Sequence, residues 1–297
     1  RCSRDWSSDV CSSDLTAEDQ APGVAPSFLD AIADYIPTGG DGSEPSISDS
    51  LNAALEDSPL ELKANILAVN ISGAGSGLMA ANINLTGNDV SNEVKTTIES
   101  ATVESTGGDV LLTTDSAANI IALTAGLGAS GVVAANLTGF GNLIGNTVAA
   151  QIIDESTVTA HDHVGLSATD DSSIRSIGLS IAVSGGASLS GIVGYNEISN
   201  TIRSQVAAST VGCDSLTASA LSEADVLSFV GGVSAGGIGA AQLSMSVNTI
   251  ANTVDASIVA VKDADTGDVV ASDVNATHNV LLTAADKIGR ASCRERV

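Results

Sequence analysis

The residues of this chain that could ligate a metal lie in two short clusters. His161 and His163 flank Asp162, and a spacing of two residues would place both imidazoles on one side of a strand. Imidazole is a good zinc ligand, but two ligands do not complete a zinc site. The cluster lies between two short predicted strands, and this position favours an exposed turn.

The second cluster, Asp263, Asp265 and Asp268, partly matches a calcium-binding loop. It lacks the bidentate Glu and the glycine that an EF-hand loop requires at fixed positions. It also lies where the chain is several residues longer than in the equivalent earlier segments, so we predict an acidic hairpin tip. The five residues of the two clusters are weak metal candidates only, and we predict neither a metal nor a cofactor.

The sequence contains no complete set of catalytic motifs. It has no phosphate-binding glycine loop and no paired cysteine motif, and its single Gly-x-Ser-x-Gly match, Gly232–Gly236, lies within one of the Gly/Ala/Ser-rich apolar stretches described below. The acidic pairs at 154–155 and 170–171 consist of neighbours that point in alternating directions. That arrangement fits solvated turns better than a pair of catalytic carboxylates. The sequence therefore predicts a protein that is not an enzyme.

An internal repeat dominates the organisation of the chain. The pattern Asn-x-(Val/Ile)-x-Asn-x-(Val/Ile) occurs four times, at intervals of 54, 54 and 52 residues, and its first and second Asn residues are Asn88 and Asn92, Asn142 and Asn146, Asn196 and Asn200, and Asn248 and Asn252. A Gly/Ala/Ser-rich apolar stretch precedes each copy, at 66–85, 120–137, 177–193 and 229–245. A repeat of this length indicates a solenoid or a tandem array.

Within each unit the sequence alternates with a period of two. Ile177, Leu179, Ile181 and Val183 alternate with small or polar residues, which is the pattern of a strand with one apolar face. Residues 117–153 and 226–254 contain no charge, but they are rich in Gly, Asn, Ser and Thr, which are poor helix formers. We therefore predict buried strands rather than membrane-spanning helices, and no membrane insertion of this segment.

The repeated asparagines allow two structural interpretations. Residues 196, 198, 200 and 202 share one parity, so the amides lie on the same inward side as the isoleucines. A buried amide needs a hydrogen-bond partner, and identical Asn residues on successive coils can provide it as a ladder. Alternatively, the Asn residues occupy corners in left-handed conformation. We predict ladders, corners or both, without a ligand.

Composition narrows the class of protein. The chain has 297 residues and a net charge of −24, and only 2% of its residues are aromatic. Few aromatics favour thin layers over a thick core. The scarcity of Lys and Arg argues against nucleic acid and against anionic lipid as partners.

The two ends differ from the rest of the chain. Residues 1–15 and 288–297 hold three of the four cysteines and the only tryptophan, and they resemble translated sequencing-adapter sequence. We expect both to be artefactual or disordered tails, and the chain to be an internal piece of a longer protein. Residues 16–58 are predicted to be an acidic lead-in with a short helix and a linker, or disordered, followed by the repeat domain at 59–287.

The repeat units resemble a known family. Residues 141–160, with Asn142, Asn146 and the Ser156-Thr157-Val158 segment, followed by the strand at 164–168, are similar to repeats of leukotoxin-like filamentous adhesins and haemagglutinin-type large exoproteins. These are passenger domains of type V secretion systems. The resemblance covers roughly residues 60–286. It implies a β-solenoid outside the bacterial outer membrane, and it transfers no functional residue.

We therefore expect an all-β protein, a parallel β-solenoid of about four units of 52–54 residues. Each unit is predicted to form two coils of roughly 27 residues, which would give a rod roughly 40 Å long. The predicted function is a non-catalytic stalk or adhesion segment that is secreted to the cell surface and binds a host-cell or matrix ligand. The alternatives are a polysaccharide-acting β-helix enzyme and a cytotoxin-like segment. Open ends of the solenoid predict end-to-end self-association.

Overall fold

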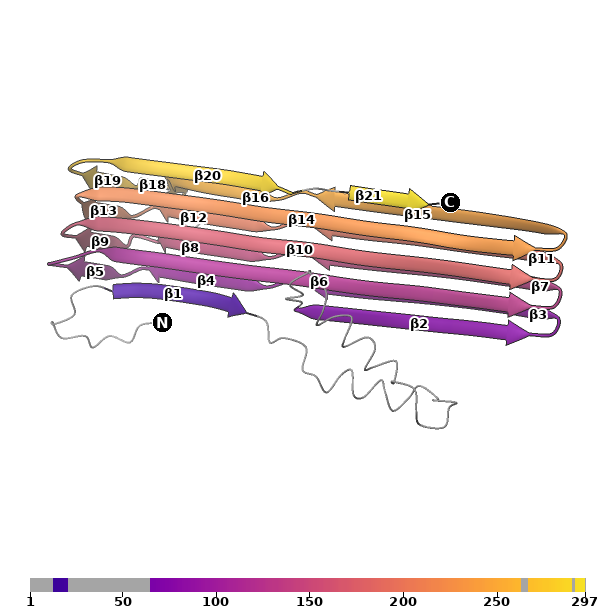
Figure 1. Cartoon of the computed structure of the whole chain (residues 1–297). Helices are drawn as coiled ribbons and strands as arrows, with labels where there is room; N and C mark the ends of the chain where they lie inside the picture. Colours follow the sequence, from indigo (N-terminus) through magenta and orange to yellow (C-terminus); the bar gives the residue numbers. More distant parts are fainter. Residues whose placement is uncertain (1–12, 21–64, 263–266, 290–291, 297) are drawn as a thin grey trace, which may run out of the picture.

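The structure is a parallel β-solenoid in which coils of the repeat stack directly on one another (Figure 1). It is a computed structural model that describes residues 13–20, 65–262, 267–289 and 292–296. All regular elements in these ranges are β-strands. No helix in the described part of the chain is long and apolar enough to cross a bilayer.

Each coil consists of one long strand and a return path of three shorter strands. The long strands and those stacked with them are β2 Ile66–Ser76, β6 Val110–Ser130, β10 His163–Ser184, β14 Ser215–Gly236 and β20 Val280–Ile288. The first return strands are β3 Met79–Val90, β7 Val133–Ile144, β11 Ala187–Ile198 and β15 Gly239–Ile250. The second are β4 Glu93–Glu99, β8 Thr147–Ile153, β12 Thr201–Ala207 and β16 Thr253–Val259. The third are β5 Thr102–Ser105, β9 Thr157–Ala160, β13 Thr210–Cys213 and β19 Asp273–Ala276.

The strands of equal rank pair in parallel and in register along the stack. Val110 of β6 pairs with Val164 of β10, and Val164 pairs with Leu216 of β14. The fourth coil carries an insertion, the antiparallel hairpin of β17 Val261–Lys262 and β18 Val269–Val270. These two strands flank the predicted acidic hairpin tip, of which residues 263–266 lie outside the described residues.

The prediction of two coils per repeat is wrong, because each unit forms a single coil. β10 runs for 22 residues without a turn, and the strand pairing connects equivalent residues of consecutive units rather than of half-units. At about 3.3 Å per residue β10 is about 70 Å long, whereas four coils about 4.8 Å apart rise only about 19 Å. The described part is therefore a flat blade that is longer along its strands than along its stacking axis.

Side chains between the two layers form distinct apolar clusters. The largest, which includes Leu112, Val148, Leu166, Ile202 and Leu216, fills the end where the third return strands lie. A second cluster around Ile120, Ile144, Ile174 and Ile198 lies near the middle of the long strands. Beyond it only Phe140, Ile192 and Val230 form an apolar group. The interior thus becomes small and polar toward the turns that end the long strands.

Glycine lets the two layers approach each other at this far end. A Cβ added to Gly178 would lie 2.4 Å from Ile192 Cδ1, and one added to Gly126 would lie 2.4 Å from Thr138 Oγ1. Any side chain at these positions would collide with the opposite layer, since packed interiors leave no spare volume. The Gly-rich stretches of the sequence are therefore strands whose small residues point inward.

Large apolar side chains point outward at the same end. We call residues 66–88, 120–142, 174–196 and 226–248 the apolar end of the blade. Most of the exposed large hydrophobic residues lie here, including Ile177 at 53% exposure and Leu189 at 56%. The prediction of buried strands is therefore correct for the strands but wrong for their outer side chains. The alternation places Ser, Gly and Asn inside and Ile, Leu and Val outside.

The chain ends differ from the predicted irregular tails. β1, Ser13–Gln20, pairs with β6, and β21, Ser292–Arg296, pairs with β14, both in parallel. An open edge strand offers unpaired N–H and C=O groups, so a neighbouring segment can pair with it whatever its origin. The predicted short helix and linker of the lead-in lie outside the described residues.

Candidate functional site

The first Asn of each repeat forms a continuous amide ladder across the four coils. Asn88 Nδ2 donates to Asn142 Oδ1 at 2.7 Å, Asn142 to Asn196 at 2.7 Å, and Asn196 to Asn248 at 2.8 Å. Asn142 and Asn196 are fully buried. Each inner amide therefore uses both its oxygen and its nitrogen within the ladder, which satisfies polar groups that would otherwise be costly to bury.

The second Asn lies in the break between the first and second return strands and bonds to the backbone of the neighbouring coil. The backbone N–H of Asn146 donates to Asn200 Oδ1 at 2.7 Å, and that of Asn200 donates to Asn252 Oδ1 at 2.9 Å. Asn92 donates in the same way to Asn146, at 3.1 Å. The side-chain oxygen of the second Asn thus accepts a hydrogen bond from a backbone N–H. This N–H has no partner in the strand pairing because the strand is interrupted there.

The corner interpretation applies to other residues. Among the described residues, the left-handed backbone conformation occurs in Gly267 and in four non-glycine residues at the next corner, Ser100, Asp154, Glu155 and Ala208. The Asn residues are absent from this set. The structure therefore uses the repeated asparagines as ladder and backbone partners, and places the left-handed corners between the second and third return strands.

A buried carboxylate lies beside the second Asn. Asp170 is fully buried and accepts hydrogen bonds from Asn200 Nδ2 at 2.6 Å, Ser172 Oγ at 2.7 Å and Asn146 Nδ2 at 3.3 Å. Burial raises the pKa of Asp170 above its usual range, and these hydrogen bonds partly oppose the rise. The prediction of a solvated turn at 170–171 is wrong, because both residues lie inside β10.

Asp170 has the parity of the inward residues that precede it, and this signal could have revealed its burial. Val164, Leu166 and Ala168 lie six, four and two residues before it and all point into the core. The equivalent residues in the adjacent coils are Ser116 and Ser222. Asp170 therefore stands at a position where both neighbouring coils have serine.

The weak metal candidates do not come together. His161 lies in an exposed turn, with Nδ1 2.6 Å from Asp162 Oδ1, whereas His163 begins β10 and has Nδ1 3.0 Å from Ser215 Oγ. Asp268 is exposed beside the hairpin, and Asp263 and Asp265 lie outside the described residues. Within the described ranges no three His, Cys, Asp or Glu residues are arranged to hold a metal ion.

A second His–Asp pair lies at the same corner of the blade. His278 Nδ1 is 2.5 Å from Asp214 Oδ1, and Thr277 Oγ1 donates to the same oxygen. The hydrogen bonds from Thr277 and His278 lower the pKa of the Asp214 carboxyl. Because both side chains of the pair are largely exposed, this contact joins adjacent turns and adds little to stability.

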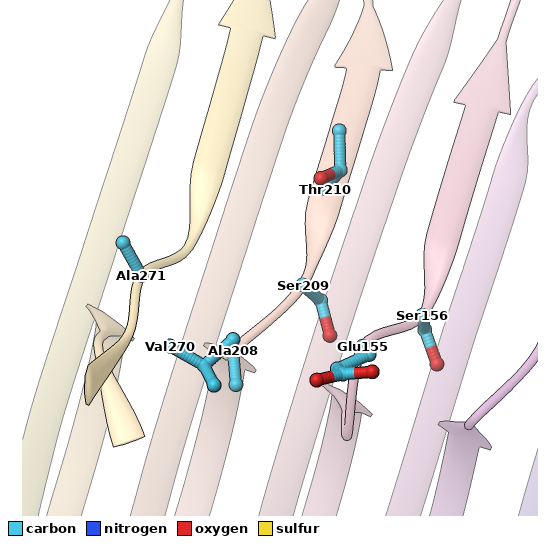
Figure 2. A pocket seen from close by; sticks show the side chains of 7 residues that line it. All are labelled: Glu155, Ser156, Ala208, Ser209, Thr210, Val270 and Ala271. Atoms are coloured by element: carbon cyan, nitrogen blue, oxygen red, sulfur yellow. The ribbon is translucent and has the colours of Figure 1, made fainter. Parts of the chain in front are cut away.

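A shallow hollow of about 170 Å³ lies along the left-handed corners (Figure 2). Its lining residues are Glu155, Ser156, Ala208, Ser209, Thr210, Val270 and Ala271. Ser156 Oγ donates to the Ile153 carbonyl at 2.6 Å, and Ser209 Oγ donates to the Ala207 carbonyl at 2.8 Å. These hydroxyls close the corner turns, and the hollow is smaller than a typical ligand pocket of about 300–1,000 Å³.

Cys213 is a buried free thiol at the end of β13. Its pKa is raised, first by burial and then by the neighbouring Asp214. A raised pKa keeps the thiol protonated, and a protonated thiol is a poor nucleophile. Cys213 therefore packs as a small apolar side chain.

No family model, curated protein or solved structure matches this chain in the comparisons. Its function is therefore inferred from its own geometry.

We predict that the inner ladder amide contributes more to stability than the outer one. Asn142→Ala removes two ladder bonds and leaves Asn88 Nδ2 and Asn196 Oδ1 without their partners, at a cost of about 2–3 kcal/mol in free energy of unfolding. Asn88→Ala is the matched control, because Asn88 is half-buried and makes one ladder bond. It should cost about 1 kcal/mol or less. Urea unfolding measures both, and equal losses would contradict the ladder.

We predict that Asp170→Ser stabilises the protein at neutral pH. A carboxyl whose folded pKa is raised binds its proton more tightly in the folded state, so stability falls as pH rises from the unfolded pKa through the raised one. Serine has no titrating carboxyl and removes this loss. The substitution should therefore raise the free energy of unfolding by about 1 kcal/mol at pH 7, or the Tm by about 2–4 °C.

The control for this substitution is Asp115→Ser, which changes an outward residue of β6. Thermal melts between pH 4 and pH 8 should show a weaker pH dependence for Asp170→Ser than for Asp115→Ser or the wild type. Loss of stability in Asp170→Ser at pH 7 would contradict the account of this carboxylate.

Proposed function

We propose that this chain is a non-catalytic stalk segment of a large exoprotein on the bacterial surface, which holds or presents an adhesive region. The observation that carries the proposal is the recurrence of the same ladder contacts in every coil. A structure whose units repeat the same contacts gains length with each added coil and needs no residue specific to one coil.

The stacking also supports a mechanical role. Every boundary between the central coils is crossed by the backbone hydrogen bonds of one long and three return strands. A force along the stacking axis acts on all of these bonds together, and the buried amide ladders add side-chain bonds at the same boundary. Separation of two coils therefore requires many bonds to break in one step.

The proposed location and partner follow from the same role. A stalk outside the outer membrane would meet host-cell or matrix molecules, and the net charge of −24 keeps an extended protein soluble. The described metal candidates lie apart from one another, and the hydroxyls of the hollow at 155–156 and 208–210 serve backbone turns. These features favour a structural role over the polysaccharide-acting alternative.

Single-molecule pulling on the full chain, through handles at its two termini, tests the stalk role. Because one coil is one repeat, we expect successive unfolding events of 52–54 residues, each releasing about 190 Å of chain. A single event at a force typical of helical domains would contradict a mechanical role. Release of reducing ends from polysaccharides by the full chain would contradict a non-catalytic one.

A further inference from the structure

The outer surface of the long strands at the apolar end forms a continuous apolar face. We call it the long-strand face, and it consists of the outward side chains of residues 67–75, 121–129, 175–183 and 227–235. Val69, Leu123, Ile177 and Phe229 occupy one register position and form an apolar row across all four coils. Ile177, Leu227 and Val233 are exposed by 53%, 46% and 54%.

The surface of this face has local depressions. The row next to the one through Ile177 contains Ile71, Ala125, Leu179 and Gly231 at one register position. Ala125 and Gly231 leave depressions beside Leu123 and Phe229 of the raised row, whereas Ile71 and Leu179 are themselves large. Two copies that meet across a two-fold axis can place the raised row of each against the depressions of the other, as packed sheets do when their side chains interdigitate.

The face is large enough for a small dimer interface. Nine residues along each of four strands span about 30 Å by 19 Å. This corresponds to about 570 Å² on each copy and about 1,100 Å² for a pair, which exceeds the minimum of about 1,000 Å² that a biological interface needs and is close to the lower limit of about 1,200 Å² for stable ones. A contiguous apolar patch of this size is also at the upper limit of what monomers expose.

The charge distribution permits contact between two copies despite the strong net charge. Arg175 is the one charged residue in the apolar end, and it lies at the border of the long-strand face. Carboxylates near the face lie at its border: Asp225 lies two residues before Leu227, and Glu295 lies in β21, which pairs with β14 at 227–231 and also contains Arg294 and Arg296. The centre of the face carries no charge. Screening over about 8 Å at physiological ionic strength weakens the remaining repulsion.

The exposed side chains cannot turn inward, because the inward positions are already occupied. Asn136 Nδ2 donates to Ser180 Oγ at 2.7 Å, and Ser190 Oγ donates to the same oxygen at 2.8 Å. A one-residue shift of a strand would break these bonds, turn the polar side chains outward and force the large apolar side chains into the narrow interior. Covering the face therefore requires another surface.

A second copy fits this face better than the alternatives. The opposite face of the apolar end, formed by β3, β7, β11 and β15, is also apolar, but the charged residues at its border, Asp89 and Glu197, are both acidic, whereas Arg175 and Asp225 at the border of the long-strand face have opposite charges. In a lipid bilayer, β3 and β15 at the two ends of their sheet would expose one backbone edge each to hydrocarbon. A second copy covers the long-strand face and leaves those edges in water.

We propose that the protein forms a two-fold dimer in which the long-strand faces of two copies pack against each other. The dimer is a property of this surface and does not depend on the stalk role. It is also distinct from end-to-end association, which uses the open strand edges and produces open chains rather than closed pairs.

The test compares two matched lysine substitutions in the full chain. Ile177→Lys places a charge at the centre of the long-strand face, and Leu189→Lys places one on the opposite face at a site of similar exposure. Analytical ultracentrifugation over a range of concentrations should show dimers for the wild type and for Leu189→Lys. Ile177→Lys should dimerise about tenfold or more weakly, as expected for a charge at an interface centre.

Circular dichroism melts establish whether each variant remains folded. Because both substituted positions point outward, we expect both variants to fold. A wild type that stays monomeric would overturn the proposal, as would equal weakening by both substitutions. Flotation with phosphatidylcholine vesicles distinguishes the lipid alternative. A monomer that binds these vesicles and loses binding in Ile177→Lys would show that the face contacts lipid and would also overturn the dimer.

Discussion

The first asparagine of each repeat can lie inside the blade because the next coil offers a matching amide at the same height. The 2.7–2.8 Å bonds from Asn88 through Asn248 meet this requirement in all four coils. A shift of one residue in any return strand would rotate the amide to the outer surface and leave its neighbours unpaired. The amide ladder therefore stabilises the register of the first return strands, although the repeat length varies between 52 and 54 residues.

The division of the blade into two halves follows from what each interior can contain. One half packs Ile, Leu and Val between its layers, whereas the far half packs serine, asparagine and glycine so closely that a Cβ on Gly178 would collide with Ile192 of the opposite layer. Since the large apolar residues of the far half alternate with these small ones, they must point outward. The exposed face and its proposed pairing are consequences of the close approach of the two layers.

The sequence predicts the repeat and the inward direction of its asparagines, because both depend on spacing and parity alone. It does not predict the number of coils per unit. Gly-rich stretches such as 177–193 are compatible either with turns or with closely packed strands, and only the opposite layer decides between them. The same layer determines whether Ile177 and Leu179 point inward or outward. The acidic character of Asp170 suggests a solvated position, whereas its parity with Val164 and Leu166 indicates the core, and the structure agrees with the parity.

The most direct measurement of the central claim is disulfide cross-linking between register partners of adjacent coils. Gln151 and Gln205 are partners 54 residues apart, and adjacent strands about 4.8 Å apart lie within the Cα separation that a disulfide spans. In a chain whose four native cysteines are replaced by alanine, Gln151→Cys with Gln205→Cys should oxidise readily to an intramolecular bond. The pair Gln151→Cys with Thr201→Cys, displaced by four residues along the same strand, should not. Equal oxidation of both pairs, or of the displaced pair alone, would contradict one coil per repeat in this register.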